Sequence, residues 1–275
     1  MQLKSNFVRI HVCAFCGTSK VRRNVSECMD SLQVEHPRDF ANVCGDQKHH
    51  TMTPICTGTS VIGIKYKDGV VLAADLLVSY GSLAKYMDFE RMFKVNESTV
   101  MCCSGDVADF QFLKHHVKEL THADNLLSDG FKLSPHALHS WITRILYNRR
   151  SRLEPLWNTY LVGGIEANGE PFIGYCNMLG VSFSENYVAT GFGAYLATPI
   201  LRECLEIKAK NDPKNITEED AISTITCAMK QLYFRDCRAF DTYQMAVINK
   251  EGVQIHGPLH LKCDWSIAEY VKGYD

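Results

Sequence analysis

The chain has 275 residues, of which 46% are hydrophobic, and its formal net charge is −2. This length and composition can supply the core of one large domain or two small ones, and the near-neutral charge gives no support to a nucleic-acid-binding surface. No run approaches the roughly 18 apolar residues of a membrane span, so we expect a soluble, intracellular protein.

Residues 1–50 show no sustained period of either 2 or 3.6, which predicts a weakly ordered leader. Twelve cysteines without a signal-peptide core indicate reduced thiols and not a disulfide framework. Cys13 and Cys16 have metal-ligand spacing, but zinc needs four ligands. The other candidates in this stretch complete no second closely spaced pair: Cys28, Cys44 and His49. We expect a propeptide here, with no metal and no cofactor.

The stretch 57–75 predicts a β-hairpin, because two apolar, β-branched runs flank an Asp68-Gly69 pair that can supply a tight turn with positive φ. Hydroxyl residues around one glycine open the stretch, and Asp75 ends its second strand. An N-terminal threonine such as Thr59 can act as a nucleophile when its own freed amine serves as the base, with a carboxylate to orient the site. The plain alternative is a threonine-rich strand followed by an aspartate that starts a turn.

The next part of the chain predicts a loop, one strand and two helices. Residues 80–93 have mixed character, and 94–103 favours a strand. A helix should follow, with Asp106 capping its free amides, and a second helix should begin at Ser134 and Pro135. Each helix carries one apolar stripe and therefore needs a sheet to cover.

The second half of the chain repeats this order of strands, helices and strands. The predicted strands are 157–164, 171–177, shorter pieces within 181–190, and a final hairpin of 243–248 with 253–256. A helix is expected over 195–208, where Pro199 either lies in the first turn or kinks it. Another should follow Thr217, which can form a reciprocal cap with Asp220. Such an order suggests two sheets packed face to face with helices on both outer faces.

The hairpin stretch and several later motifs resemble proteasome β subunits, a branch of the N-terminal-nucleophile hydrolases. The later motifs include Tyr80-Gly81-Ser82, Ser104-Gly105-Asp106, His139-Ser140-Trp141, Pro155-Leu156-Trp157-Asn158 and Tyr233-Phe234-Arg235-Asp236. The resemblance covers about 51–275 and implies an α+β fold, a four-layer αββα sandwich. It also implies three parts: a leader of 1–50, a β-subunit domain of 51–257 and a C-terminal tail of 258–275.

In active subunits of this family, a threonine works with an aspartate, a lysine, and a later serine, aspartate and serine. The corresponding residues here are Thr59, Asp75, Arg91, Phe192, Asp236 and Ala239. Arginine stays protonated and is a poor proton relay, and neither phenylalanine nor alanine can supply a hydroxyl. We therefore expect a degenerate site without catalytic residues, in which Asp75 forms an ion pair with Arg91.

Two functions remain open from the sequence. The first is a non-catalytic structural β subunit of the 20S core proteasome, supporting ring assembly, half-particle joining and ubiquitin-dependent protein degradation. The resemblance then implies other proteasome α and β subunits as partners, in a hetero-heptameric β ring within a 28-subunit particle of the cytoplasm and nucleus, with no nucleic acid or membrane. It also implies leader removal between His50 and Thr51. The alternative is an active threonine peptidase that uses Thr59.

Overall fold

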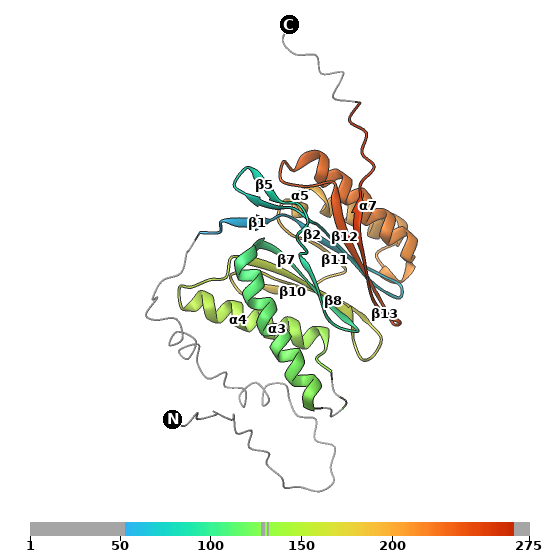
Figure 1. Cartoon of the computed structure of the whole chain (residues 1–275). Coiled ribbons are helices and arrows are strands. Elements are labelled where there is room, and N and C mark those ends of the chain that lie inside the picture. Colours follow the sequence, from blue (N-terminus) through green and yellow to red (C-terminus); the bar gives the residue numbers. More distant parts are fainter. Residues whose placement is uncertain (1–52, 128–129, 131, 267–275) are drawn as a thin grey trace, which may run out of the picture. The chain divides into compact units, whose positions relative to one another are not determined.

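The computed structural model describes residues 53–127, 130 and 132–266. Cys13, Cys16 and the expected processing point at His50 and Thr51 lie outside these residues. The described chain forms two antiparallel sheets with helices (Figure 1). None of the helices in this part is long and apolar enough to cross a membrane.

The larger sheet has eight strands in the order β10-β9-β8-β7-β1-β4-β5, with β6 also paired to β7. Its strands are β1 (Cys56–Gly58), β4 (Val78–Tyr80), β5 (Leu83–Tyr86), β6 (Met92–Asn96), β7 (Thr99–Asp106), β8 (Asn158–Ile165), β9 (Pro171–Cys176) and β10 (Ser182–Ser184). The smaller sheet has five strands in the order β11-β2-β3-β12-β13. They are β2 (Val61–Tyr66), β3 (Gly69–Asp75), β11 (Tyr187–Ala189), β12 (Thr242–Asn249) and β13 (Gly252–His260).

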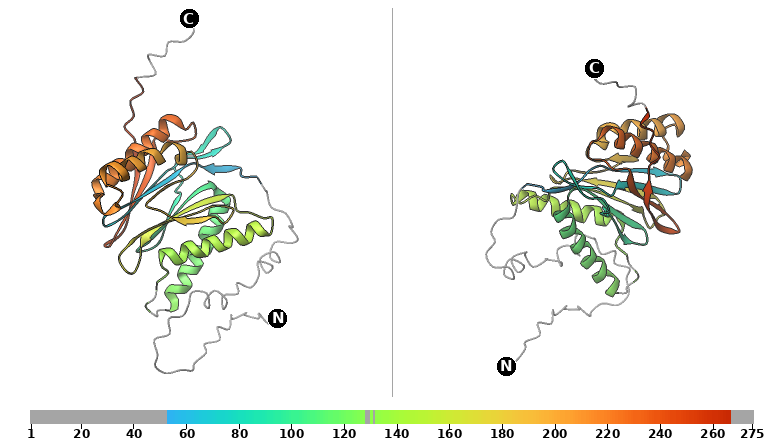
Figure 2. Two further views of the ribbon diagram at one scale, coloured as in Figure 1. Left: turned by 180° about the vertical axis from the view of Figure 1, so that it is seen from behind. Right: turned by 45° about the horizontal axis from the view of Figure 1, so that its top comes forward.

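The helices fall into two groups, one beside each sheet (Figure 2). Beside the larger sheet lie α3 (Val107–Leu127) and α4 (Pro135–Ser151), and beside the smaller sheet lie α5 (Gly193–Leu196), α6 (Thr198–Glu203), the π-helix η1 (Cys204–Lys208), the 3₁₀-helix η2 (Pro213–Asn215) and α7 (Glu218–Arg235). Three apolar clusters separate four layers: one between α3, α4 and the larger sheet, one between the sheets, and one between the smaller sheet and α5–α7. The predicted αββα sandwich is therefore confirmed.

Strand β3 shows why the sandwich buries both faces of its sheets. Val70 and Leu72 pack into the cluster between the sheets, whereas Val71 and Ala73 pack into the cluster under α7. Every residue of β3 is buried. A strand covered on both sides can be apolar throughout, so it lacks the alternation of a strand with one face in water.

The predicted helix caps are confirmed. The Asp106 carboxylate accepts hydrogen bonds from two backbone N–H groups in the first turn of α3, at 2.9 and 3.1 Å, and the Ser134 hydroxyl accepts one at the start of α4. Thr217 accepts the backbone N–H of Asp220 and donates its hydroxyl to the Asp220 carboxylate. Each of the contacts from a backbone N–H satisfies a donor that has no partner within its helix, and the Thr217–Asp220 side-chain contact holds the cap in place.

The first hairpin is present, but the predicted turn is wrong. Tyr66 pairs with Gly69, so the two loop residues are Lys67 and Asp68, and neither Asp68 nor Gly69 has a positive φ. Gly69 is instead required by a close approach from β12. A Cβ atom at this position would lie 1.9 Å from the carbonyl oxygen of Ile248.

Three further boundaries differ from the prediction. The stretch 80–93, expected to be loop, contains β5, whose residues are all exposed and therefore show no hydrophobic period. The single strand expected over 94–103 is two strands, β6 and β7, separated by a turn at Glu97 and Ser98. Residues at the start of the expected hairpin form β1, which belongs to the larger sheet.

The C-terminal half also departs from the predicted ranges. The helix expected over 195–208 is divided among α5, α6 and η1, and Pro199 lies in the first turn of α6. Strand β13 continues to His260, which pairs with Thr242, and Leu261 is buried. The expected domain boundary after residue 257 therefore falls inside a strand.

The contact at Gly69 predicts a large loss of stability on substitution. Gly69→Ala should lower the free energy of unfolding by about 3 kcal/mol, because backbone must move to admit the methyl group. Gly81→Ala is the matched control: Gly81 has φ +61° and no atom within 4 Å of an added Cβ, so it should lose only about 1 kcal/mol from backbone strain. Urea unfolding of the full-length chain would measure both, and equal losses would contradict the role assigned to Gly69.

Candidate functional site

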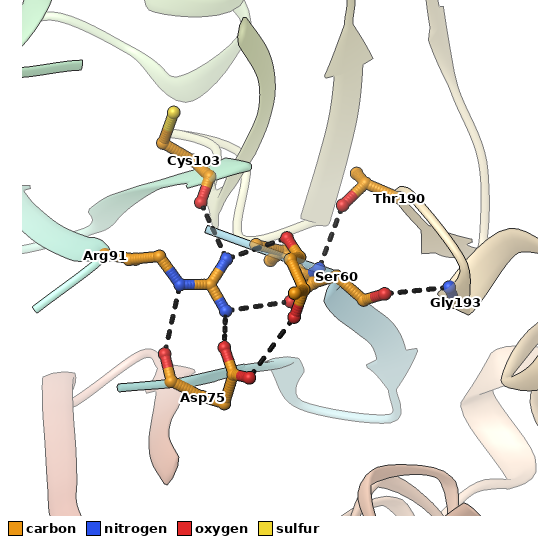
Figure 3. Close-up of polar contacts among 8 residues, drawn as sticks. Ser60, Asp75, Arg91, Cys103, Thr190 and Gly193 are labelled. Carbon is orange, nitrogen blue, oxygen red and sulfur yellow. Dashed lines mark hydrogen bonds and ion pairs between the residues drawn. The ribbon is translucent and has the colours of Figure 1, made fainter. Parts of the chain in front are cut away.

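Arg91 lies immediately before β6 and reaches the place where the two sheets meet (Figure 3). Its side chain and that of Asp75, at the end of β3, are each only 2% exposed. The Arg91 Nη2 atom forms an ion pair with Asp75 Oδ1, and Arg91 Nε donates to the Asp75 carbonyl at 3.1 Å. The expected ion pair is therefore confirmed.

The same guanidinium also binds backbone carbonyls of other segments. Arg91 Nη1 donates to the carbonyls of Thr59 at 2.8 Å and Cys103 at 3.2 Å, and Nη2 donates to the carbonyl of Ser60 at 3.1 Å. Together with the Asp75 carbonyl, the Arg91 side chain therefore contacts four backbone carbonyls from three parts of the chain. Because Cys103 is in the larger sheet and Asp75 in the smaller one, Arg91 ties the two sheets together.

Burial is the largest influence on the Asp75 carboxyl and raises its pKa above the ordinary value. The Arg91 guanidinium, the Thr59 hydroxyl and the Phe240 N–H act in the opposite direction, because each stabilises the charged form. Arginine keeps its proton under all ordinary conditions. Removing Arg91 would therefore raise the pKa of Asp75 further and favour its neutral form.

Thr59 donates its hydroxyl to Asp75 Oδ2 at 3.2 Å. The strand just before it, β1, is inserted between β4 and β7, where Gly58 pairs with Val78 on one side and Gly105 on the other. An added Cβ at Gly58 would lie 2.4 Å from the Cδ atom of Arg91, so only glycine fits. Thr59 thus directly follows a strand that is paired on both sides within the larger sheet.

A second set of contacts fixes the start of β2. Ser60 Oγ accepts the Gly193 N–H at 2.8 Å, and Thr190 Oγ1 accepts the Val61 N–H at 2.9 Å. Phe192, in the same turn as Gly193, is 61% exposed and is absent from these contacts. The Gly191-Phe192-Gly193 turn therefore contributes a backbone donor and no side chain to this centre.

The two remaining predicted site residues follow α7. Asp236 Oδ1 accepts the Arg238 N–H at 3.0 Å, and its Oδ2 is buried with no hydrogen-bond partner in the described part of the chain. Ala239 packs against the cluster under the smaller sheet. No hydrogen bond between described residues joins Asp236 to Thr59; the segment reaches the centre through the Phe240 N–H, which bonds to Asp75.

The structure thus brings together Thr59, Asp75 and Arg91 from the predicted set. Ser60 and Thr190 were not predicted as site residues. Each accepts a hydrogen bond from a residue about 130 positions away in the sequence, and a small polar side chain was the only signal that the sequence offered. No cluster of three or more His, Cys, Asp or Glu residues in the described ranges could hold a metal ion.

The buried pair predicts strongly coupled substitutions. Arg91→Met and Asp75→Asn should each lower the free energy of unfolding by about 3 to 5 kcal/mol, because either leaves a buried partner unsatisfied. The double variant should lose about 1 to 3 kcal/mol less than the sum of the two. Exposed Arg202→Met is a control expected to change stability by under about 0.5 kcal/mol. Additive losses in urea unfolding of the full-length chain would show that the pair is not coupled.

Comparisons with known proteins agree with this fold. The family described as "Proteasome subunit" matches residues 55–248. The chain is 45% identical to "Proteasome subunit beta type-4" of Xenopus laevis, over 82% of this chain and 91% of that protein, and 39% identical to the Drosophila melanogaster protein of the same name, over 86% and 87%. It is 38% identical to "Proteasome subunit beta type-7" of Saccharomyces cerevisiae, over 89% and 94%. The chain therefore belongs to the proteasome subunit family, and its αββα sandwich is the N-terminal-nucleophile hydrolase fold of that family.

Proposed function

We propose that the chain is a non-catalytic β subunit of the 20S core proteasome, which supports ring assembly for protein degradation. Its partners are other proteasome α and β subunits, in the cytoplasm and nucleus. The names of its relatives support this role, since several are proteasome subunits of beta type-4 or type-7.

The position of β1 carries the proposal that the subunit is non-catalytic. A threonine nucleophile of this class needs its own free amine as the base, and exposing that amine on Thr59 requires a break after Gly58. Gly58 is paired on both sides in the larger sheet and lies against Arg91. Cleavage there would separate β1 from the rest of the chain, so the fold favours an intact bond.

The side chains around Thr59 support the same conclusion. A lysine could give up a proton or lower the pKa of the threonine hydroxyl, but Arg91 stays charged. Its N–H groups donate to the Asp75 carboxylate and to four backbone carbonyls. Phe192 and Ala239 bring no hydroxyl to the centre. The centre is therefore suited to holding the sheets together. The side-chain acceptor of the Thr59 hydroxyl is the Asp75 carboxylate, which is also held in an ion pair by Arg91.

The proposed processing point leaves β1 in place. Removal of residues 1–50 between His50 and Thr51 would start the chain eight residues before Thr59. The described part supports a role for this extension, because the Ile55 N–H donates to Asp106 Oδ1 at 3.2 Å, directly ahead of β1. Residues after the cut therefore contribute to the sheet, whereas a start at Thr59 would discard them.

In this proposal, two parts of the C-terminal segment have different roles. Trp265 packs edge-to-face against Phe234 and Tyr233 at the end of α7, with ring centroids 4.9 and 5.6 Å away. Trp265 therefore contacts its own domain. We assign contact with the neighbour, and the joining of half-particles, to residues 267–275.

Loss of the Thr59 hydroxyl tests the non-catalytic role. In particles that contain Thr59→Ala, we expect every peptidase activity to stay within about twofold of wild type, because the hydroxyl only donates to Asp75 and a part-buried hydrogen bond of this kind contributes about 1 kcal/mol to stability. Particle yield, measured by native gel, is the control for assembly. Complete loss of one activity at normal yield would establish the peptidase alternative.

Deletion of the last nine residues tests the tail. A chain ending at Ser266 keeps the Trp265 contacts, so it should fold and enter half-particles, while complete particles should become fewer and less resistant to salt. Trp265→Ala in the full-length chain is the matched control for the loss of packing on α7. Unchanged yield and salt resistance of the shortened chain would remove the tail from half-particle joining.

A further inference from the structure

The free edge of the larger sheet has features of a docking surface. Strand β10 is outermost, its three residues are all exposed, and its outer side pairs with no strand in the described part of the chain. Exposed edge strands favour association with other chains, and free-standing proteins usually block them. Neither proline nor a charged side chain occurs in β10, and its length of three residues limits an added strand to a short pairing.

The loop that leads into β10 is held rigidly against α4. Asn177 Oδ1 accepts the backbone N–H groups of Leu179 and Val181 at 3.0 and 3.1 Å. Gly180 has φ +80°, and an added Cβ would lie 2.8 Å from the Cβ of Tyr147 on α4. The close approach of Gly180 to Tyr147 forms one wall of a groove.

The groove has a volume of about 520 Å³ and lies between Gly180 and one side of α4, where it is lined by Thr143, Arg144, Tyr147, Asn148, Ser151 and Arg152. Arg149, on the same helix, pairs with Glu154 at 3.4 Å. Arg144 and Arg152 have no carboxylate partner among the residues that the structure describes. The groove therefore offers two uncompensated positive charges beside hydroxyl and amide groups.

Exposed apolar side chains lie on α4 and in the loop around Gly180. Tyr147 lines the groove, and Tyr147, Leu179 and Val181 are 55%, 49% and 51% exposed. Large apolar side chains gathered at an open sheet edge mark an interaction site more often than a solvated surface. The partner must therefore supply both apolar contact and negative charge.

We propose that this α4–β10 surface receives an extended, acidic segment of an adjacent proteasome subunit, which lies along β10 and places its carboxylates against Arg144 and Arg152. This rests on the proposed function, since it names a contact of the same subunit within the particle. Addition of a strand to a free edge supplies backbone hydrogen bonds, and side chains on alternate positions supply specificity. A neutral or basic segment would cover the two arginines without compensating them, at a cost in free energy.

A second copy of this chain fits the surface less well. The opposite edge of the same sheet is β5, which carries Lys85 beside the rings of Tyr80 and Tyr86. If copies met head to tail through these two edges, Lys85 would approach the arginines of the groove, and like charges at an interface weaken association. The charge therefore favours a different subunit as the neighbour.

Site-specific cross-linking in the assembled particle tests the proposal. A photo-reactive benzoylphenylalanine at Leu179 should cross-link to an acidic segment of one other subunit, identified by mass spectrometry, whereas the same group at Ile207, 70% exposed on η1, should not yield that peptide. A cross-link from Leu179 to residues 267–275 of this chain, to a basic segment, or to no subunit would overturn the proposal. A chain that never enters particles, even without the photo-reactive group, would instead overturn the proposed function.

Charge reversal provides a second test. Arg144→Glu with Arg152→Glu should lower incorporation into particles by about tenfold or more at low salt, because both charges would then repel the acidic segment. Arg202→Glu with Lys214→Glu, two exposed positions near the smaller sheet, is the matched control and should incorporate normally. Equal incorporation of the two double variants, by native gel with quantitative mass spectrometry, would overturn the acidic partner.

Discussion

The guanidinium of Arg91 is the contact on which the meeting point of the two sheets depends. Burying an ion pair usually costs more in desolvation than the pair returns, unless further hydrogen bonds complete it. Here four backbone carbonyls complete it. The chain crosses from the larger sheet to the smaller one between Gly58 and Val61, and Arg91 binds both carbonyls of that crossing. The carbonyls of Thr59 and Ser60 lie between two strands, and the buried guanidinium gives them hydrogen-bond donors in place of backbone N–H groups.

This constraint also bears on chemistry. An N-terminal-nucleophile site needs a chain end at the threonine. In the function we propose, the same place stays a crossing between the sheets, where a Cβ added to Gly58 would lie 2.4 Å from Arg91. A buried arginine that holds the crossing cannot also serve as a proton relay, because its charge is required for the contacts. In the function we propose, the fold of the family is therefore retained around a centre whose groups hold the two sheets together.

Features set by residues close in the sequence could be predicted, such as the caps at Asp106 and Ser134. The ion pair of Asp75 with Arg91 joins residues 16 positions apart, and it was predicted because the family resemblance places both residues at one site. The need for glycine at position 69 could not be predicted, because it arises from the close approach of the Ile248 carbonyl on another strand. Strand β5 was missed because an exposed edge has no hydrophobic period, and the contact of Ser60 with Gly193 depends on tertiary structure alone.

The state of the bond between Gly58 and Thr59 in assembled particles is the most direct test of this account. N-terminal sequencing and intact-mass measurement of the chain, purified with its native complex, would show where the mature protein begins. The account predicts a start near Thr51, with β1 retained and the bond after Gly58 intact. A mature chain that begins at Thr59 would contradict it, because the freed amine would then lie beside the hydroxyl and the larger sheet would have lost β1 from between β4 and β7.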